Sequence, residues 1–257
     1  MIFSAATYNI HTHKGGDNLG NLGAVIRVIG RYNPDIIALQ EIDANLFRKK
    51  GIDQTRLIAE DLGMNFQPDP PRPEDQGPYA NAILSRHPLR LIRAERLPGL
   101  PDYHFPVRSA LWVQVRIGDE ILQVINTHLG HHSRERLRQA GALLGEAWAG
   151  NPRCRPPLIL CGDFNAGPRS KAYRLLCRKL HDTQDQLETG RPKKTWPSRF
   201  PLRRIDHVFL SHDLLVRKVI VPSSSLARKA SDHRPLVVEL ERPDNPSSII
   251  LAPAHSP

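Results

Sequence analysis

Cysteine is scarce in this chain, which contains only Cys154, Cys161 and Cys177. None of them forms a C-x-x-C pair, and an odd number of cysteines does not suggest a disulfide framework. No group of histidines and cysteines has the spacing of a zinc finger, which argues against structural zinc. This cysteine usage suits a reducing compartment, so we expect a cytoplasmic protein.

Long apolar runs are absent as well. No stretch approaches the roughly 20 apolar residues that a membrane-spanning helix needs. The first residues, MIFSAATYNIH, have neither the basic segment nor the long apolar segment of a secretory signal. The sequence therefore predicts no transmembrane segment and no secretory signal.

Acidic residues are outnumbered, with 26 Asp and Glu against 36 Lys and Arg and a net charge of +10. A net positive surface attracts polyanions over long distances. Nucleic acids, anionic phospholipids and phosphorylated metabolites all fit this charge. Charge alone is also compatible with a soluble protein that is merely rich in arginine.

The length of 257 residues and the 40% hydrophobic content are ordinary for a globular protein. We expect a monomer with one domain over residues 1–242. A domain of this size can bury a core without disulfide bonds or structural metal ions. Residues 243–257 are rich in Pro and Ser and are expected to form a disordered tail.

Hydrophobic patterns and turn residues predict more strands than helices. The expected strands are 2–10, 35–41, 79–85, 89–97, 107–117, 120–128, 158–161, 205–210, 215–221 and 234–240. The expected helices are 18–31, 53–62, 133–148 and 170–179, with Ser133 as a cap, and the proline-rich stretch 67–78 is expected to be a surface loop. Two mixed sheets packed face to face, with helices outside, would accommodate this α/β order.

Polar residues gather where the apolar runs begin or end. They are Asn9, Glu41, His128, Asp163, Asn165, Asp206, Asp232 and His233. Hard divalent cations such as Mg²⁺ prefer oxygen ligands, which Glu41, Asp232 and the Asn9 amide provide. Loops at one edge of the sheets are therefore expected to carry the function.

The segment Gly162-Asp163-Phe164-Asn165 follows the apolar run Leu158–Cys161. The glycine allows a sharp turn, after which Asp163 and Asn165 would point out of the loop together. A carboxylate can orient and deprotonate water, and an amide can donate to a phosphate oxygen. A simple Asx turn after a strand is the alternative explanation.

The segment Ser231-Asp232-His233-Arg234-Pro235 sets a carboxylate beside an imidazole. Histidine can stabilise a developing phosphorane by donating a hydrogen bond, or act as an acid or base. A second carboxylate improves this role by fixing the tautomer, and Asp206 is the candidate. An isolated Asp-His pair is otherwise more often a surface turn.

Seven segments in order carry a family resemblance. They are Tyr8-Asn9-Ile10, Pro34–Glu41, Asn81–Arg86, Asn126-Thr127-His128-Leu129, Gly162–Asn165, Ile205–Phe209 and Ser231–Pro235. Together they resemble the endonuclease/exonuclease/phosphatase superfamily, the group of deoxyribonuclease I, exonuclease III, neutral sphingomyelinases and inositol polyphosphate 5-phosphatases. The resemblance implies a deoxyribonuclease I-like, four-layered α/β sandwich of two mixed sheets flanked by helices.

The resemblance also implies roles for the polar residues. Glu41 would be the main ligand of Mg²⁺, for which Mn²⁺ can substitute, with Asn9 and Asp232 nearby. Asp163 would position or activate water. The remaining catalytic candidates are His128, which would flank the phosphate, Asn165 and His233, which would hold its oxygens, and Asp206 behind His233. Tyr79 and Asn81 lie where relatives keep groups near that first histidine, and Arg108 is either a substrate contact or part of a structural ion pair.

The implied reaction is in-line attack of water on phosphorus, since no cysteine or serine nucleophile has a plausible base. Histidine at position 128 resembles the deoxyribonuclease, sphingomyelinase and 5-phosphatase branches, whereas apurinic-site endonucleases usually carry tyrosine there. Thr195-Trp196-Pro197-Ser198 resembles a signature of small bacterial members of the family, described as metal-dependent hydrolases.

The segment 191–204 is basic and contains no acidic residue. Its cations are Arg191, Lys193, Lys194, Arg199, Arg203 and Arg204. A basic loop beside a phosphoesterase site would suit a polyanionic backbone, with Lys193 and Lys194 as contacts. Trp196 and Phe200 could stack on bases. A solvated loop with a packed tryptophan is the alternative, and anionic phospholipid headgroups fit the same charges.

Three functions remain open from the sequence. The first is a Mg²⁺-dependent endo- or exonuclease that acts on DNA. The second is a phosphodiesterase or phosphatase for a phospholipid or a small phosphorylated metabolite. The third is an inactive binding module on the same fold, which ranks last because Glu41, Asp163 and His233 are all present.

Overall fold

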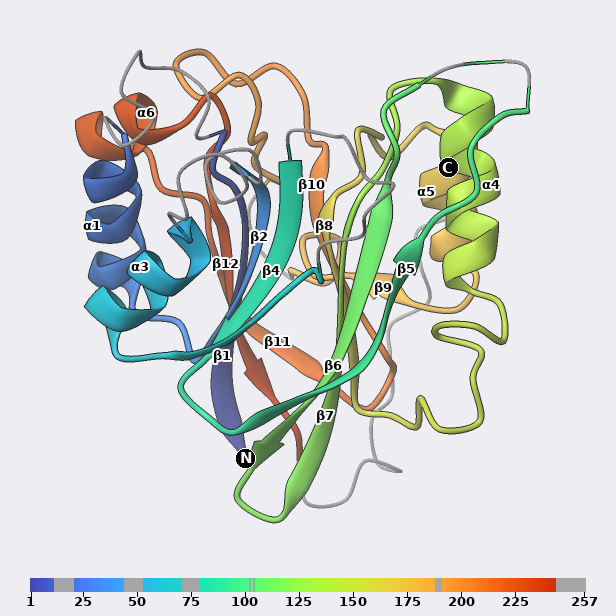
Figure 1. Ribbon diagram of the computed structural model, residues 1–257, viewed down its shortest axis with the longest axis horizontal. Helices are drawn as coiled ribbons and strands as arrows, with labels where there is room; N and C mark the ends of the chain where they lie inside the picture. The colour runs from blue at the N-terminus through green and yellow to red at the C-terminus, as the bar shows by residue number, and fades with distance from the viewer. Residues whose placement is uncertain are drawn as a thin grey trace.

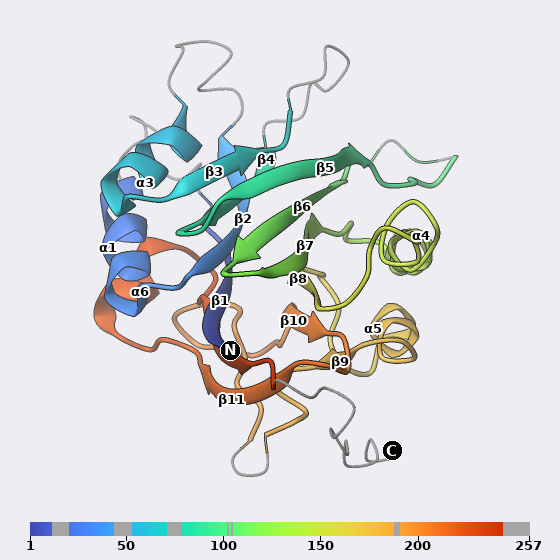
Figure 2. The same cartoon turned by 90° about the horizontal axis from the view of Figure 1, so that it is seen from below.

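The computed structural model describes residues 1–11, 21–43, 53–70, 79–101, 103, 105–187 and 191–243. Two six-stranded sheets pack face to face, and helices cover their outer faces (Figures 1 and 2). The predicted four-layered α/β sandwich is confirmed. No helix among these residues is long and apolar enough to cross a membrane.

The first sheet has the order β11-β12-β1-β2-β4-β3. Its strands are β1 (Ile2–Asn9), β2 (Ile36–Asp43), β3 (Asn65–Pro68), β4 (Tyr79–Ser85), β11 (Leu215–Ile220) and β12 (Leu236–Glu241). Strands β1 and β2 are parallel neighbours, and the other pairs in this sheet are antiparallel. The ends of β1 and β2 therefore lie at one edge of the sheet.

The second sheet has the order β5-β6-β7-β8-β10-β9. Its strands are β5 (Leu89–Arg96), β6 (Ser109–Ile117), β7 (Glu120–His128), β8 (Leu158–Asp163), β9 (His181–Asp182) and β10 (Asp206–Leu210). Here β7 and β8 are the parallel pair. Every residue of β8 and β10 is buried, which explains why their apolar stretches, Leu158–Cys161 and Val208–Leu210, do not alternate with polar residues.

Helices α1 (Leu22–Tyr32), α3 (Gln54–Leu62) and α6 (Ser225–Ala230) cover the first sheet, and α4 (Ser133–Leu143) and α5 (Lys171–Leu176) cover the second (Figure 1). One apolar core lies between the sheets and includes Ile83, Val124 and Val238. A further core lies under each helical layer. Both faces of each sheet are thus covered, so a site can form only at the loops along the sheet edges.

Local signals mark one end of each of three expected helices. Asp53 caps α3 by accepting a hydrogen bond from the Arg56 amide, and Ser170 caps α5 in the same way. Asn33, in the left-handed conformation with φ 45°, ends α1. Each boundary lies within a few residues of its predicted place.

Other predictions were wrong in detail. The helix expected over 133–148 ends at Leu143, because Gly145 starts a series of turns in which its amide bonds to Ala142. The cap position of α4 is His132, not Ser133. Part of the expected loop 67–78 pairs in β3, and residues 71–78 lie outside the described residues.

Helix α6 and strands β3 and β9 were not expected, because each is too short to show a hydrophobic period. The predicted tail, residues 243–257, lies outside the described residues from position 244 onward. One domain over residues 1–242 stays a prediction.

Candidate active site

Strand register brings the predicted residues to one edge of the sandwich. Asn9 ends β1 and His128 ends β7, and each strand is the parallel neighbour of a strand that carries a carboxylate near its end. Asp206 begins β10, which runs antiparallel to β8, so it lies directly opposite Asp163. Asp232 and His233 precede β12, which is antiparallel to β1. The fold therefore collects residues that are far apart in the sequence.

The backbone at this edge has unusual conformations. Glu41 lies in an irregular part of the β2–β4 pairing and has φ 56°, and Asn165 has φ 48°. Non-glycine residues seldom adopt positive φ, and such strain tends to be kept at functional sites. Gly162 has φ 147°, and a Cβ there would lie 1.9 Å from the Thr127 carbonyl oxygen. Only glycine fits this close approach between β7 and β8.

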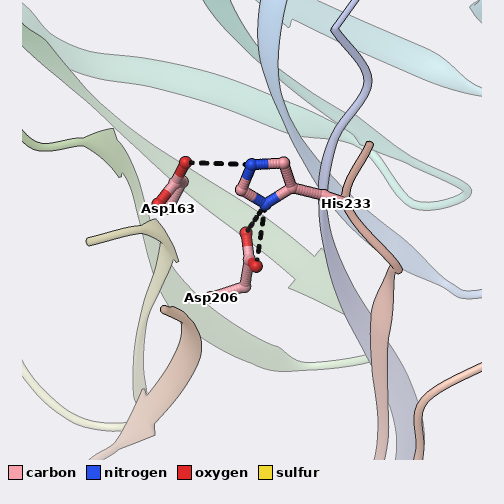
Figure 3. A group of neighbouring side chains, drawn as sticks. All are labelled: Asp163, Asp206 and His233. Atoms are coloured by element: carbon pink, nitrogen blue, oxygen red, sulfur yellow. Dashed lines mark hydrogen bonds and ion pairs between the residues drawn. The ribbon is translucent and has the colours of Figure 1, made fainter. Parts of the chain in front are cut away.

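Asp163, Asp206 and His233 form a buried group at the centre of this edge (Figure 3). His233 Nδ1 lies 2.9 Å from Asp206 Oδ2 and 3.1 Å from Oδ1 and donates to this carboxylate. The opposite ring nitrogen, Nε2, faces Asp163 Oδ2 at 3.7 Å. Ser231 Oγ anchors the turn before His233 by donating to the Asn9 carbonyl oxygen.

The electrostatics of this group favour opposite charges on Asp163 and His233. Burial and the neighbouring charge of Asp206 raise the pKa of Asp163 to about 6. Burial alone would lower the pKa of His233, but the carboxylates of Asp206 and Asp163 outweigh it and raise that pKa to about 10. The imidazole is thus held as a hydrogen-bond donor.

Glu41 is held by two neighbours. Asn9 Nδ2 donates to Glu41 Oε1 at 3.0 Å and to Asp163 Oδ2 at 3.1 Å. His11 Nδ1 donates to Glu41 Oε2 at 2.7 Å. Burial alone would raise the pKa of Glu41, but hydrogen bonds and nearby histidines outweigh it and lower that pKa to about 2. The carboxylate is therefore charged and held in place.

A divalent cation fits beside Glu41 and Asp232. The Oδ1 atom of Asp232 is buried and accepts no hydrogen bond from the described residues, and its ion-pair neighbour, His11 Nδ1, is 3.7 Å away. A buried carboxylate oxygen without a hydrogen bond is stabilised by a nearby cation. Two carboxylates match the oxygen preference of Mg²⁺. Asn9 turns its amide nitrogen toward Glu41, so its oxygen faces the His11 amide instead. A ligand role for Asn9 stays a prediction.

Asp163, Asp206 and His233 also lie close enough together to hold a metal ion. Both nitrogens of His233 face carboxylates, however, and Nδ1 must carry hydrogen in order to donate to Asp206. A raised histidine pKa further disfavours a metal ligand, which must be deprotonated. The Glu41 side of the site is the better place for the cation.

His128 has different surroundings. Arg108 Nη1 lies 3.1 Å from its Nδ1, and Asn165 Nδ2 lies 3.1 Å from its Nε2. Burial and the Arg108 charge hold the pKa of His128 well below its ordinary value. Its Nε2 is also 3.4 Å from Asp163 Oδ2, so His128 lies next to the group formed by Asp163, Asp206 and His233.

The segment 191–204 contacts the residues Asp232, His233 and Arg234. Arg234 Nε donates to the Ser198 carbonyl oxygen at 2.7 Å, and the Ser198 amide donates to the Asp232 carbonyl oxygen at 2.6 Å. The Trp196 ring lies 6.5 Å from the His233 ring, and the Arg203 guanidinium covers Trp196 at 5.5 Å. The Trp196 ring therefore packs against other residues of the same chain.

The remaining substrate-binding candidates are dispersed. Lys193 and Lys194 are exposed. Asn81 is buried and donates to Ser109, so it ties β4 to β6. Tyr79 pairs through its backbone with Asp43, and its side chain lies outside the described part of the structure. None of these contacts tests a role in substrate binding.

Comparison with known proteins identifies the family. The model of the endonuclease/exonuclease/phosphatase family matches residues 6–233. The chain belongs to this family. It is accordingly a hydrolase of phosphoester bonds, and members of the family generally depend on a metal ion. The predicted superfamily is confirmed.

Relatives and solved structures agree with this assignment. The uncharacterized protein YbhP of Escherichia coli (strain K12) is 27% identical over 256 residues, covering 93% of this chain and 96% of that protein. A functionally unknown conserved protein from Enterococcus faecalis V583 has a TM-score of 0.76 at 22% identity, covering 93% and 100% of the two chains. The Bacteroides thetaiotaomicron VPI-5482 mannosyl-6-phosphatase has a TM-score of 0.74 at 21% identity, covering 93% and 99%. These two structural similarities show a shared fold.

Sequence reasoning missed two features of this part of the structure. His11 was not singled out, although it follows Asn9 by two residues and bonds to Glu41. A buried network behind β10 was also missed, in which Asp182 contacts His207 and Arg204 at 2.5 and 3.2 Å. The spacing Asn-x-His was a usable signal for His11, whereas the network joins separate segments and had none.

Proposed function

We propose that the protein is a divalent-metal-dependent phosphodiester hydrolase that cleaves DNA, as an endo- or exonuclease, through in-line attack of water. The observation that carries this proposal is the convergence of Asp163, the His233–Asp206 pair and the charged Glu41 at one edge of the sandwich. A buried carboxylate beside two histidines supplies a base and hydrogen-bond donors without a covalent nucleophile.

Each residue of the chain has a separate task in this reaction. Asp163 orients the attacking water and accepts its proton, for which its raised pKa of about 6 is well suited. His233, held by Asp206, donates to an oxygen on which negative charge develops. His128 and Asn165 lie 3.1 Å apart and can donate to another such oxygen.

The carboxylates of Glu41 and Asp232 are the proposed metal ligands. Glu41, with Asp232 and Asn9 beside it, would hold Mg²⁺, for which Mn²⁺ can substitute. The cation would supply Lewis-acid stabilisation of the phosphoryl oxygens. The chain's own contribution is to hold Glu41 charged through the hydrogen bonds from Asn9 and His11.

The basic segment 191–204 supports a polyanionic substrate. Its exposed cations lie on a loop that is tied to Asp232 and Arg234, next to the predicted site. Arg204 differs from the rest, because its guanidinium turns inward to Asp182 and Asp185. The other five cations can meet a phosphate backbone.

A phospholipid is the second candidate substrate, because two apolar side chains of the same loop are exposed. Phe200 is 78% and Leu202 68% exposed, and both lie among basic residues. Apolar side chains within a basic surface suit the interface of an anionic membrane. A small phosphorylated metabolite also remains a candidate, since one protein of similar fold is named a mannosyl-6-phosphatase.

A substrate panel tests the proposal. Purified protein is assayed with Mg²⁺ or Mn²⁺ on supercoiled plasmid, oligonucleotides, bis-p-nitrophenyl phosphate, anionic phospholipid vesicles and mannose 6-phosphate. Asp163→Ala and His233→Ala should each lower kcat/KM by about 100-fold or more. Exposed residues of the same types provide the controls, Asp119→Ala and His212→Ala, which should retain activity.

The outcomes separate the reaction from its substrate. Cleavage of plasmid or oligonucleotides that is lost in both site variants supports the whole proposal. Hydrolysis of lipid or sugar phosphate alone would overturn DNA as the substrate while leaving the chemistry intact. No hydrolysis of any substrate, together with no metal binding by titration calorimetry, would overturn the proposed reaction.

A further inference from the structure

The Nδ1 atom of His128 receives a hydrogen bond from an arginine, whereas its Nε2 atom faces a carboxylate oxygen, Asp163 Oδ2, at 3.4 Å. Arg108 Nη1 lies 3.1 Å from His128 Nδ1, and both residues are buried. A guanidinium has only N–H donors and no acceptor. Nδ1 must therefore keep its lone pair, and the ring hydrogen must be on Nε2.

The Nε2 hydrogen meets a second donor. Asn165 Nδ2 lies 3.1 Å from Nε2 and also donates to the Leu129 carbonyl oxygen at 2.9 Å, which fixes the orientation of the amide. Two N–H groups cannot bond to each other. One oxygen with two lone pairs, such as a phosphoryl oxygen, can accept from both.

We propose that Arg108 is a positioning residue that holds His128 in the Nε2–H tautomer, so that His128 and Asn165 together present two N–H donors to one phosphoryl oxygen. The role of these donors rests on the proposed function. The assignment of the tautomer does not depend on the proposed function, because it follows from the hydrogen bond between Arg108 and His128.

The backbone holds Arg108 where this role requires it. Arg108 directly precedes β6, whose Ala110 pairs with Thr127 of β7. The Leu97 amide donates to the Arg108 carbonyl oxygen at 2.7 Å. These contacts keep the guanidinium behind the imidazole, on the opposite side from Asn165, so Arg108 reaches the reaction through His128.

His233 provides an internal contrast. Its Nδ1 donates to the carboxylate of Asp206, so Nδ1 carries a hydrogen. His128 has a lone pair at the same ring position because its partner is a cation. The two histidines of the site are thus fixed in opposite ways by partners of opposite charge.

Nitrogen-15 NMR of the histidine rings tests the tautomer directly. Spectra of the metal-free protein are compared with those of Arg108→Met, Arg108→Lys and the control Arg116→Met, an exposed arginine of β6. The His128 signals are assigned by their loss in His128→Gln. Wild type should show a lone pair on Nδ1 and hydrogen on Nε2.

The variants should separate by their hydrogen-bonding capacity. Arg108→Met should shift His128 toward the Nδ1–H tautomer, whereas Arg108→Lys should keep the wild-type pattern because an ammonium also only donates. Hydrogen on Nδ1 in wild type, or an unchanged tautomer in Arg108→Met, would overturn the proposal. Wild type and Arg108→Lys decide the question even if Arg108→Met fails to fold.

Kinetics on the substrate identified by the panel provide the second readout. Arg108→Met should lower kcat by about 10- to 100-fold with KM nearly unchanged, and Arg108→Lys should restore most of the loss. A rise in KM with unchanged kcat would instead make Arg108 a direct substrate contact and overturn the positioning role. If no substrate is cleaved, the proposed function fails, while NMR still decides the tautomer.

Discussion

Substitution of Gly162 by alanine tests whether the close approach of β7 and β8 sets the position of Asp163. The new Cβ would lie 1.9 Å from the Thr127 carbonyl oxygen, a backbone atom that cannot rotate away. Non-bonded heavy atoms are ordinarily about 3.5 Å apart, so the strands would have to separate by roughly 1.5 Å. A separation of that size breaks the ladder hydrogen bonds on either side of Gly162.

The loss of folding stability in Gly162→Ala follows from these contacts. Two or three lost backbone hydrogen bonds cost about 2–3 kcal/mol, at about 1 kcal/mol each. Alanine at φ 147° adds about 1–2 kcal/mol of backbone strain. We therefore expect Gly162→Ala to destabilise the fold by about 3–5 kcal/mol. For a chain of this size that corresponds to a fall in Tm of about 6 to 20 °C.

Two other glycines provide the controls. Gly118 has φ +60° in the β6–β7 turn with nothing within 4 Å of a new Cβ, so Gly118→Ala carries only the strain, about 1 kcal/mol. Gly99 has neither the positive φ nor a close neighbour, and Gly99→Ala should be neutral. Thermal and urea unfolding measure all three, and kcat/KM should fall only for Gly162→Ala. A Gly162→Ala variant no less stable than Gly118→Ala would refute the reasoning.

Two further predictions concern metal binding and acid stability. Glu41→Gln should weaken Mg²⁺ binding by about 10-fold or more in calorimetry, because it removes a charged ligand, while Asp119→Asn should not; equal affinities would place the metal elsewhere. Burial alone would raise the pKa of Asp182, but the charges of His207 and Arg204 outweigh it and lower that pKa. Its charge therefore stabilises the fold above the unfolded pKa of about 4, and this stability is lost as the pH falls further. Asp182→Asn should lower Tm at pH 7, and the difference from wild type should shrink below pH 4; a constant difference would contradict this.

The sequence predicted most of the site because its residues lie where apolar strands end. Asn9, Glu41, His128 and Asp163 follow runs long enough to be read as strands, and all four runs belong to the two parallel pairs of the sheets. Parallel strands place their ends at one edge, so predicting strand ends was nearly equivalent to predicting the cluster.

The sequence could not predict which way a charged side chain turns. Arg204 ends a basic run and was grouped with its neighbours, yet it lies 2.7 Å from Asp185 and 3.2 Å from Asp182 in a buried network. The contact between the Arg203 guanidinium and the Trp196 ring was not expected, and stacking of Trp196 on bases stays a prediction. The Arg204 contacts join separate segments, and the Arg203–Trp196 contact depends on how the loop folds back on itself, so a periodic local pattern encodes neither.

The charge of the site opposes the charge of the chain. The net charge is +10, but Glu41, Asp163, Asp206 and Asp232 converge at one edge. Carboxylates repel one another and repel a phosphate, so a phosphoester can bind among them only with compensating cations. The chain supplies part of this compensation through His233, whose pKa is raised to about 10, and through His11, whose Nδ1 lies 3.7 Å from Asp232 Oδ1. Under the proposed function, the basic surface would attract a polyanion and the acidic site would bind its phosphoester with the help of a cation, so the two charges would be complementary.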